Sequence, residues 1–144
     1  MDLKNLALGR HVLIEYYGCT TEIIENNGLI EQYMREAADH AGARVVESVF
    51  HHFNPYGVSG AVIIAESHLT IHTWPEYDFA SVDVYTCGDE VDPSKAADYL
   101  SVKLQAKKTE LMEIPRGIAG KIKQFANQRD NKKPEKIEME KSEG

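Results

Sequence analysis

Apolar positions at strand and helix spacing divide the first 114 residues into alternating elements. Residues 11–17 are rich in side chains that favour strands, and Gly18 ends the run. Thr20 or Thr21 can cap a helix, and apolar side chains then recur at three- and four-residue steps up to Gly42. The spacing predicts one amphipathic helix, whose apolar positions are Ile23, Ile30, Met34, Ala37 and Ala41.

The rest of the pattern predicts four more strands and a second helix. Residues 54–60 contain Asn-Pro and two glycines, which indicates a turn, and residues 74–78 form the next one. Asp92 is a candidate cap, and Pro93 suits the first position of the second helix. The predicted strands are residues 43–53, 61–73, 79–87 and, with a weaker pattern, 108–114, and the apolar stripe of the helix is Ala96, Ala97, Leu100 and Leu104.

This order of elements predicts an α+β two-layer sandwich, with an antiparallel sheet and both helices packed on one face. Within residues 79–87, Asp83, Tyr85 and Cys87 alternate with the valines and point to the second face of the sheet. We expect that face to be a binding surface or a dimer interface. Residues 1–116 form the single predicted domain, and 117–144 form a mobile, charged tail that can be partly helical.

Composition narrows the classes of function. Sixteen Lys and Arg against 23 Asp and Glu give a net charge of −7, which disfavours binding to nucleic acid. No apolar run is long enough to span a bilayer, and the first residues lack a secretory signal, so we expect a soluble, cytoplasmic protein. In that reducing compartment Cys19 and Cys87 are expected to be free thiols.

Polar side chains are densest in residues 66–76, and three interpretations compete there. His68 and His72 share a strand face and could bind a metal with His51 or His52, but no zinc pattern is present. Ser67 could be a hydrolytic nucleophile with a histidine base, but no nucleophile elbow surrounds it. The third interpretation, satisfied polar groups along an edge strand, suits a single histidine better than so many polar residues.

Three segments together resemble the prokaryotic S-adenosylmethionine decarboxylase proenzymes. They are PYGVSG at 55–60, ESHLTIHTWPEY at 66–77 and DVYTCGDEVDP at 83–93, and the resemblance extends from about Gly9 to Ile114. It implies a self-processing decarboxylase that makes decarboxylated S-adenosylmethionine for spermidine synthesis. It also implies a homodimer of αβ units, a four-layer αββα sandwich with both active sites near the interface. No pyridoxal phosphate and no metal are expected.

The resemblance implies that Ser67 attacks the carbonyl of Glu66 and that the chain breaks there, giving a β chain of 1–66 and an α chain of 67–144. Ser67 becomes a pyruvoyl group, which forms a Schiff base with the substrate and supplies the electron sink that decarboxylation requires. His72 is then the proton acceptor during processing. Strand parity puts Ser67 and His72 on opposite faces, so we expect an irregularity at residues 66–70.

The same resemblance assigns Ser59 as a helper in processing and Cys87 as the proton donor during turnover. Glu76 matches the position that binds the ribose hydroxyls, and Phe53, or the ring of His72, could stack on adenine. Cys19 matches no role and is expected to be structural. Two alternatives remain: a pyruvoyl-dependent arginine or ornithine decarboxylase on the same fold, and a non-catalytic binding module.

Overall fold

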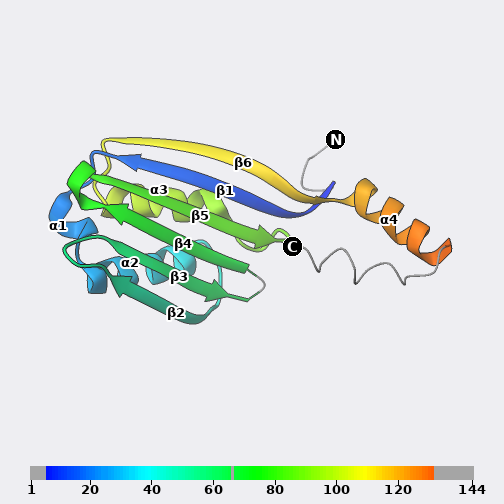
Figure 1. Cartoon of the computed structure of the whole chain (residues 1–144), viewed down its shortest axis with the longest axis horizontal. Coiled ribbons are helices and arrows are strands. Elements are labelled where there is room, and N and C mark those ends of the chain that lie inside the picture. The colour runs from blue at the N-terminus through cyan, green and yellow to red at the C-terminus, as the bar shows by residue number, and fades with distance from the viewer. Residues whose placement is uncertain (1–5, 66, 132–144) are drawn as a thin grey trace.

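The computed structural model describes residues 6–65 and 67–131, and its centre is a six-stranded sheet in the order β2-β3-β4-β5-β1-β6 (Figure 1). All neighbouring strands in the sheet are antiparallel. Helices α1 to α3 lie on one side of the sheet, which confirms the predicted α+β architecture. The strands are β1 (Ala7–Tyr17), β2 (Val45–His52), β3 (Val58–Ile64), β4 (Ser67–Trp74), β5 (Phe79–Cys87) and β6 (Lys108–Ile118). The helices are α1 (Thr21–Ile24), α2 (Asn27–His40), α3 (Pro93–Lys103) and α4 (Ala119–Asn131), with a short 3-10 helix, η2, at Pro75–Tyr77.

The core lies between the sheet and its helices, and we call that side of the sheet the helix face. Strand β5 alternates strictly, because Val82 and Val84 are buried while Asp83 and Tyr85 stay partly exposed. The hydroxyl of Tyr16 on β1 donates to the carbonyl of Ala97 on α3 at 2.8 Å, which ties the two layers together. The opposite side, which we call the free face, has no helix on it in Figure 1.

The single helix predicted after Thr20 is wrong, because the structure contains two helices there, α1 and α2. Asn26 has an extended backbone, and its side chain accepts a hydrogen bond from the backbone N–H of Leu29 at 3.0 Å. Asparagine competes with a continuing helix by capping a new one, so the axis breaks at this residue. The predicted end is confirmed, since Gly42 follows α2 with a φ of +93°.

The single strand predicted for 61–73 is also wrong. Residues 58–64 form β3 and residues 67–74 form β4, and Ile64 pairs directly with Ser67 across a tight hairpin. The segment AVIIAESHLTIHT contains no Gly, Pro or Asn to mark that turn. Residues 58–60, which were predicted to be part of a turn, instead extend β3.

The other strand and helix boundaries differ less from the predicted ones. Strand β1 begins before the predicted residue 11, and β6 continues past 114 to Ile118. The predicted cap of α3 is confirmed, because Asp92 accepts a hydrogen bond from the backbone N–H of Ser94 at 3.0 Å. Part of the predicted tail is helical, and α4 extends away from the sheet in Figure 1. Among the described residues, no helix has the length and apolar character that crossing a membrane requires.

Candidate active site

Ser67 is the first residue of β4, immediately after the hairpin turn, and its hydroxyl is buried. It lines a cavity of about 150 Å³ together with Thr86 and Cys87 at the end of β5. The three residues come from adjacent antiparallel strands, so the start of β4 lies beside the end of β5 (Figure 1). We call them the Ser67 cluster. Glu66, the other residue of the expected cleavage site, lies outside the described residues.

A second group of predicted residues lies toward the other end of the sheet. Ser59 on β3 pairs with His72 on β4, and the Ser59 hydroxyl hydrogen-bonds to His72 Nδ1 at 2.8 Å. Both residues line a hollow of about 310 Å³, which His51 also borders. We call Ser59 and His72 the His72 cluster.

The predicted substrate-binding residues lie at the same end as the His72 cluster. Phe53 follows the last residue of β2 and is 47% exposed, with its ring against that of His51 at 4.5 Å between centroids. Glu76 is exposed within η2, directly after β4. The side chain of Trp74, the last residue of β4, was not singled out from the sequence. It is 39% exposed, and its ring lies 6.4 Å from that of His72.

The irregularity predicted at 66–70 is not found in residues 67–70, where β4 pairs with β3 in unbroken register. A regular strand advances about 3.3 Å per residue, so the five steps from Ser67 to His72 separate them by roughly 16 Å. They also differ in face, because Ser67 alternates with the buried Leu69 and Ile71 whereas His72 is exposed. Within one chain, therefore, His72 does not reach Ser67.

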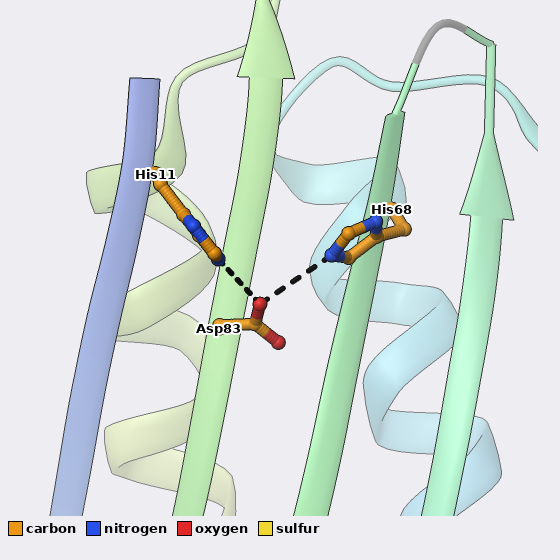
Figure 2. Close-up of side chains that lie close together, drawn as sticks. All are labelled: His11, His68 and Asp83. Carbon is orange, nitrogen blue, oxygen red and sulfur yellow. Dashed lines mark hydrogen bonds and ion pairs between the residues drawn. The ribbon is translucent and has the colours of Figure 1, made fainter. Parts of the chain in front are cut away.

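A third group lies on the free face between these two regions. His68 and Asp83 were named separately from the sequence, but their grouping with His11 was not predicted. Figure 2 shows Asp83 of β5 between His11 of β1 and His68 of β4. One oxygen of Asp83 lies 2.5 Å from His11 Nε2 and 3.4 Å from His68 Nε2, and the Thr70 hydroxyl donates to the other oxygen. Partial burial opposes ionisation of Asp83, but the hydrogen bonds from Thr70, His11 and His68 outweigh it and lower the pKa.

Within the described part of the chain, His11, His68 and Asp83 form the only group of three side chains close enough to hold a metal ion. Arg116 donates to His11 Nδ1 at 2.7 Å, because a guanidinium has no acceptor. His11 therefore carries its proton on Nε2 and donates it to Asp83. The lone pair that a metal would need is absent from that nitrogen, so the geometry fits a hydrogen-bonded network better than a metal site. Of the earlier metal candidates only His68 belongs to this group, and His51, His52 and His72 form no such group with other described residues.

The two cysteines are both free thiols, as predicted, and they differ in environment. Cys19 is only 4% exposed, and burial with the nearby Asp78 raises its pKa to about 11. Its thiol donates to the carbonyl of Tyr16 at 3.6 Å. These contacts suit the structural role expected for Cys19. Cys87 is partly exposed at the end of β5, beside Ser67.

Comparison with known proteins identifies the family. Residues 10–117 match the family model described as S-adenosylmethionine decarboxylase. An S-adenosylmethionine decarboxylase proenzyme from Thermotoga petrophila is 54% identical over 111 residues, which cover 77% of this chain and 85% of that protein. The proenzyme of the same name from Caldicellulosiruptor saccharolyticus is 51% identical over 121 residues, covering 84% of this chain and 98% of that protein.

The fold agrees with these matches. The crystal structure of the adenosylmethionine decarboxylase from Aquifex aeolicus superposes with a TM-score of 0.74 at 36% identity. The match covers 79% of this chain and 94% of that one. Sequence and fold lead to the same assignment: the chain belongs to the S-adenosylmethionine decarboxylase family.

Proposed function

We propose that the chain is a proenzyme that cuts itself between Glu66 and Ser67 and then decarboxylates S-adenosylmethionine, releasing CO2. The products of the cut are a β chain, 1–66, and an α chain, 67–144. Family membership supports the reaction. The observation that carries the proposed cut is the Ser67 hydroxyl, which is buried, has no hydrogen-bond partner among the described residues, and directly follows a tight turn.

The cut needs no external nucleophile. The Ser67 hydroxyl attacks the carbonyl carbon of residue 66, the C–N bond breaks, and the chain is joined by an ester while the nitrogen becomes a free amine. Because nucleophile and carbonyl belong to adjacent residues, proximity supplies much of the rate. A base then takes the Cα proton of residue 67, the Cβ–Oγ bond breaks, and residues 1–66 leave as a carboxylate. Water finally replaces the nitrogen at residue 67, which departs as ammonia.

The pyruvoyl group made in this way would supply a carbonyl that accepts the electrons released when CO2 leaves. The chain's own residues fit its position, because residue 67 opens onto a cavity of about 150 Å³ that Cys87 also lines. Cys87 is the proposed proton donor to the substrate carbon after CO2 has left.

The proposed base, His72, must come from a second copy of the chain. It lies roughly 16 Å from Ser67 along its own strand, too far for proton transfer. The helices cover the face to which the Ser67 side chain belongs, so a second copy can approach residue 67 only from the free face. A base supplied by that copy would therefore come from the free face.

A two-fold dimer would provide such a base. If two free faces pack with a two-fold axis across the strands, the Ser67 end of each sheet faces the His72 end of its partner. Each dimer would then hold two sites, each built from one Ser67 cluster and the partner's His72 cluster. Exposed apolar side chains on the free face, Val49, Ile63 and Met112, are available to be buried in this interface.

The substrate would lie in the hollow beside His72. Its ribose hydroxyls suit the exposed carboxylate of Glu76, and its adenine suits a flat partner, either Phe53 or Trp74. The sulfonium cation can lie over an aromatic face.

Intact-mass spectrometry of the denatured protein, together with CO2 release from carboxyl-labelled S-adenosylmethionine, tests the proposal. The wild-type chain should separate into two fragments that meet at residues 66 and 67, the second lacking a serine amine. Ser67→Ala should remain one chain and release no CO2. A Ser67→Ala chain that is still cut at this bond would contradict the proposal, and so would a wild-type chain that stays intact yet releases CO2.

A further inference from the structure

Thr86, a residue with no assigned role, is buried without a hydrogen bond. It is 1% exposed, and its hydroxyl has no partner among the described residues. Thr73 makes the contrast clear, since it is also buried, but its hydroxyl accepts from the backbone N–H of Val58 and donates to the carbonyl of Ile24, both at 2.9 Å. Thr73 uses its hydroxyl to hold the fold, whereas the hydroxyl of Thr86 has no such structural use.

Ser67 and Thr86 are neighbours across two strands. His68 of β4 pairs with Tyr85 of β5, so the next step of the same register brings Ser67 opposite Thr86. Both side chains belong to the helix face, because Ser67 alternates with Leu69, and Thr86 with Val84. Opposite residues on one face have Cβ atoms about 5 Å apart, a separation that one water molecule can bridge.

The cavity beside them is large enough for water. Its volume of about 150 Å³ exceeds the space that a single water molecule needs, and two buried hydroxyls face it. Arg44 and Glu90 also line it and add polar groups at the wall. A polar cavity of this size with unpartnered hydroxyls is the kind of site that ordered water occupies.

We propose that Thr86 is a positioning residue for self-processing, and that it acts by holding a water molecule in this cavity against the Ser67 hydroxyl. This inference rests on the proposed cut between residues 66 and 67. The water accepts a hydrogen bond from the Ser67 hydroxyl and donates one to Thr86 Oγ1, which fixes the Ser67 side chain for attack on the preceding carbonyl.

The same site supplies the water that the last processing step consumes. After elimination, residue 67 carries a Cα=Cβ double bond and an amine, and a proton shift converts these into a methyl group and a C=N bond. One water molecule adds to that carbon, and ammonia leaves, so atoms balance with no oxidant or reductant. A water already held beside residue 67 by Thr86 is in position to add.

The test compares Thr86→Val with Thr86→Ser, since valine keeps the shape without the hydroxyl and serine keeps the hydroxyl. Freshly purified protein is followed by intact-mass spectrometry as it is cut. We expect processing to be at least about tenfold slower in Thr86→Val and within about threefold of wild type in Thr86→Ser. The melting temperature of Thr86→Val should change little, because the Thr86 hydroxyl bonds to no other described group of the protein and only the proposed water loses a partner.

Hydroxylamine separates the first step from the later ones, because it cleaves the ester and leaves serine at the start of the α chain. Thr86→Val should yield this serine-terminated chain more slowly than wild type does. A second variant, Ala43→Val, enlarges another residue that lines the cavity while keeping Thr86, and should also slow processing. If Thr86→Val is folded and is cut at the wild-type rate, the inference is wrong. If Thr86→Val fails to fold, a wild-type rate in Ala43→Val overturns it instead. A wild-type chain that is never cut would defeat the proposed function and this role with it, whereas a wild-type rate in folded Thr86→Val defeats the role of Thr86 alone.

Discussion

Asp83 connects three strands of the free face through its two carboxylate oxygens. It accepts from Thr70 on β4 and from His11 on β1, while Arg116 on β6 fixes the proton position of His11. The ring of Tyr85 packs beside this network, with its centroid 5.1 Å from that of His11 and 5.3 Å from the Arg116 guanidinium carbon. A network of this kind orders the side chains of the free face before any second copy binds to it.

Replacement of Asp83 should therefore have an effect that depends on pH. Its pKa is lowered in the folded state, so the ionised carboxylate stabilises the fold above its unfolded pKa of about 3.9, and this contribution disappears as the pH falls through the folded value. We expect Asp83→Asn to lower the free energy of unfolding by about 1–2 kcal/mol at pH 7 and by less at pH 3, which is below the unfolded pKa. Urea titrations at fixed protein concentration measure this.

The exposed Asp39 of α2 provides the control for that experiment. Asp39→Asn should change the free energy of unfolding by less than about 0.5 kcal/mol at both pH values. An equal loss at pH 7 and pH 3 for Asp83→Asn would show that the carboxylate charge does not stabilise the network.

At the scale of elements, the predicted architecture was right because it depends on periodicity, which the long strands and helices express clearly. The two errors have local causes. Asn26 breaks a helix whose apolar spacing continues across it, and the turn at Ala65 interrupts a run with no turn residue. In both places a few backbone or side-chain contacts end the element, although the spacing of apolar residues continues without a break through the sequence.

Gly60 of β3 has no side chain, which leaves room for the ring of Phe50 on the neighbouring strand β2. It pairs with Phe50, and a Cβ added at Gly60 would lie 1.9 Å from Phe50 Cδ2, so the ring occupies the space above the glycine. Gly60→Ala should lower the free energy of unfolding by about 1–3 kcal/mol, because the ring must leave its place. Urea unfolding of the two chains in a Ser67→Ala background, which keeps each polypeptide whole, measures the difference.

Gly120 of α4 is the matched control, since a Cβ there meets nothing within 4 Å. Gly120→Ala should leave the free energy of unfolding unchanged or raise it slightly, by less than about 1 kcal/mol. Equal effects of the two substitutions would mean that the Phe50 contact does not determine the cost at Gly60.

At the scale of the whole molecule, the proposed dimer links the uncovered free face to the separation of Ser67 from His72. The roles of Ser67, His72 and Cys87 came from resemblance to a family, and no spacing in the sequence reveals that two of them are roughly 16 Å apart. That separation follows from an unbroken β4, which the expected irregularity would have shortened. Thr86 was not predicted as a site residue, and Asp83 was predicted only to point to the second face of the sheet, because the partners of both residues come from other strands of the folded sheet.

A charge placed on the free face should disrupt the proposed dimer. Ile63 is 45% exposed on the free face, and burial of an aspartate there without a partner is costly. We expect Ile63→Asp to be monomeric by analytical ultracentrifugation at micromolar concentration and to be processed at least about tenfold more slowly than wild type. Val102→Asp, at a still more exposed position on α3, should keep the wild-type mass in solution. A dimeric, normally processed Ile63→Asp would mean that this part of the free face is not in the interface.

The most direct measurement is complementation between two inactive chains. Ser67→Ala lacks the proposed nucleophile and His72→Ala lacks the proposed base, so neither should be cut when it is produced alone. In a mixed dimer, the His72→Ala chain keeps Ser67 and meets the intact His72 of its partner.

Intact-mass spectrometry of the two chains, co-produced in equal amounts, should then show the His72→Ala chain cut between residues 66 and 67. Up to about half of its copies should be cut, because random pairing places half of them in mixed dimers. The Ser67→Ala chain should stay whole. If the His72→Ala chain remains uncut in verified mixed dimers, the site is not shared between two copies, and the account is contradicted.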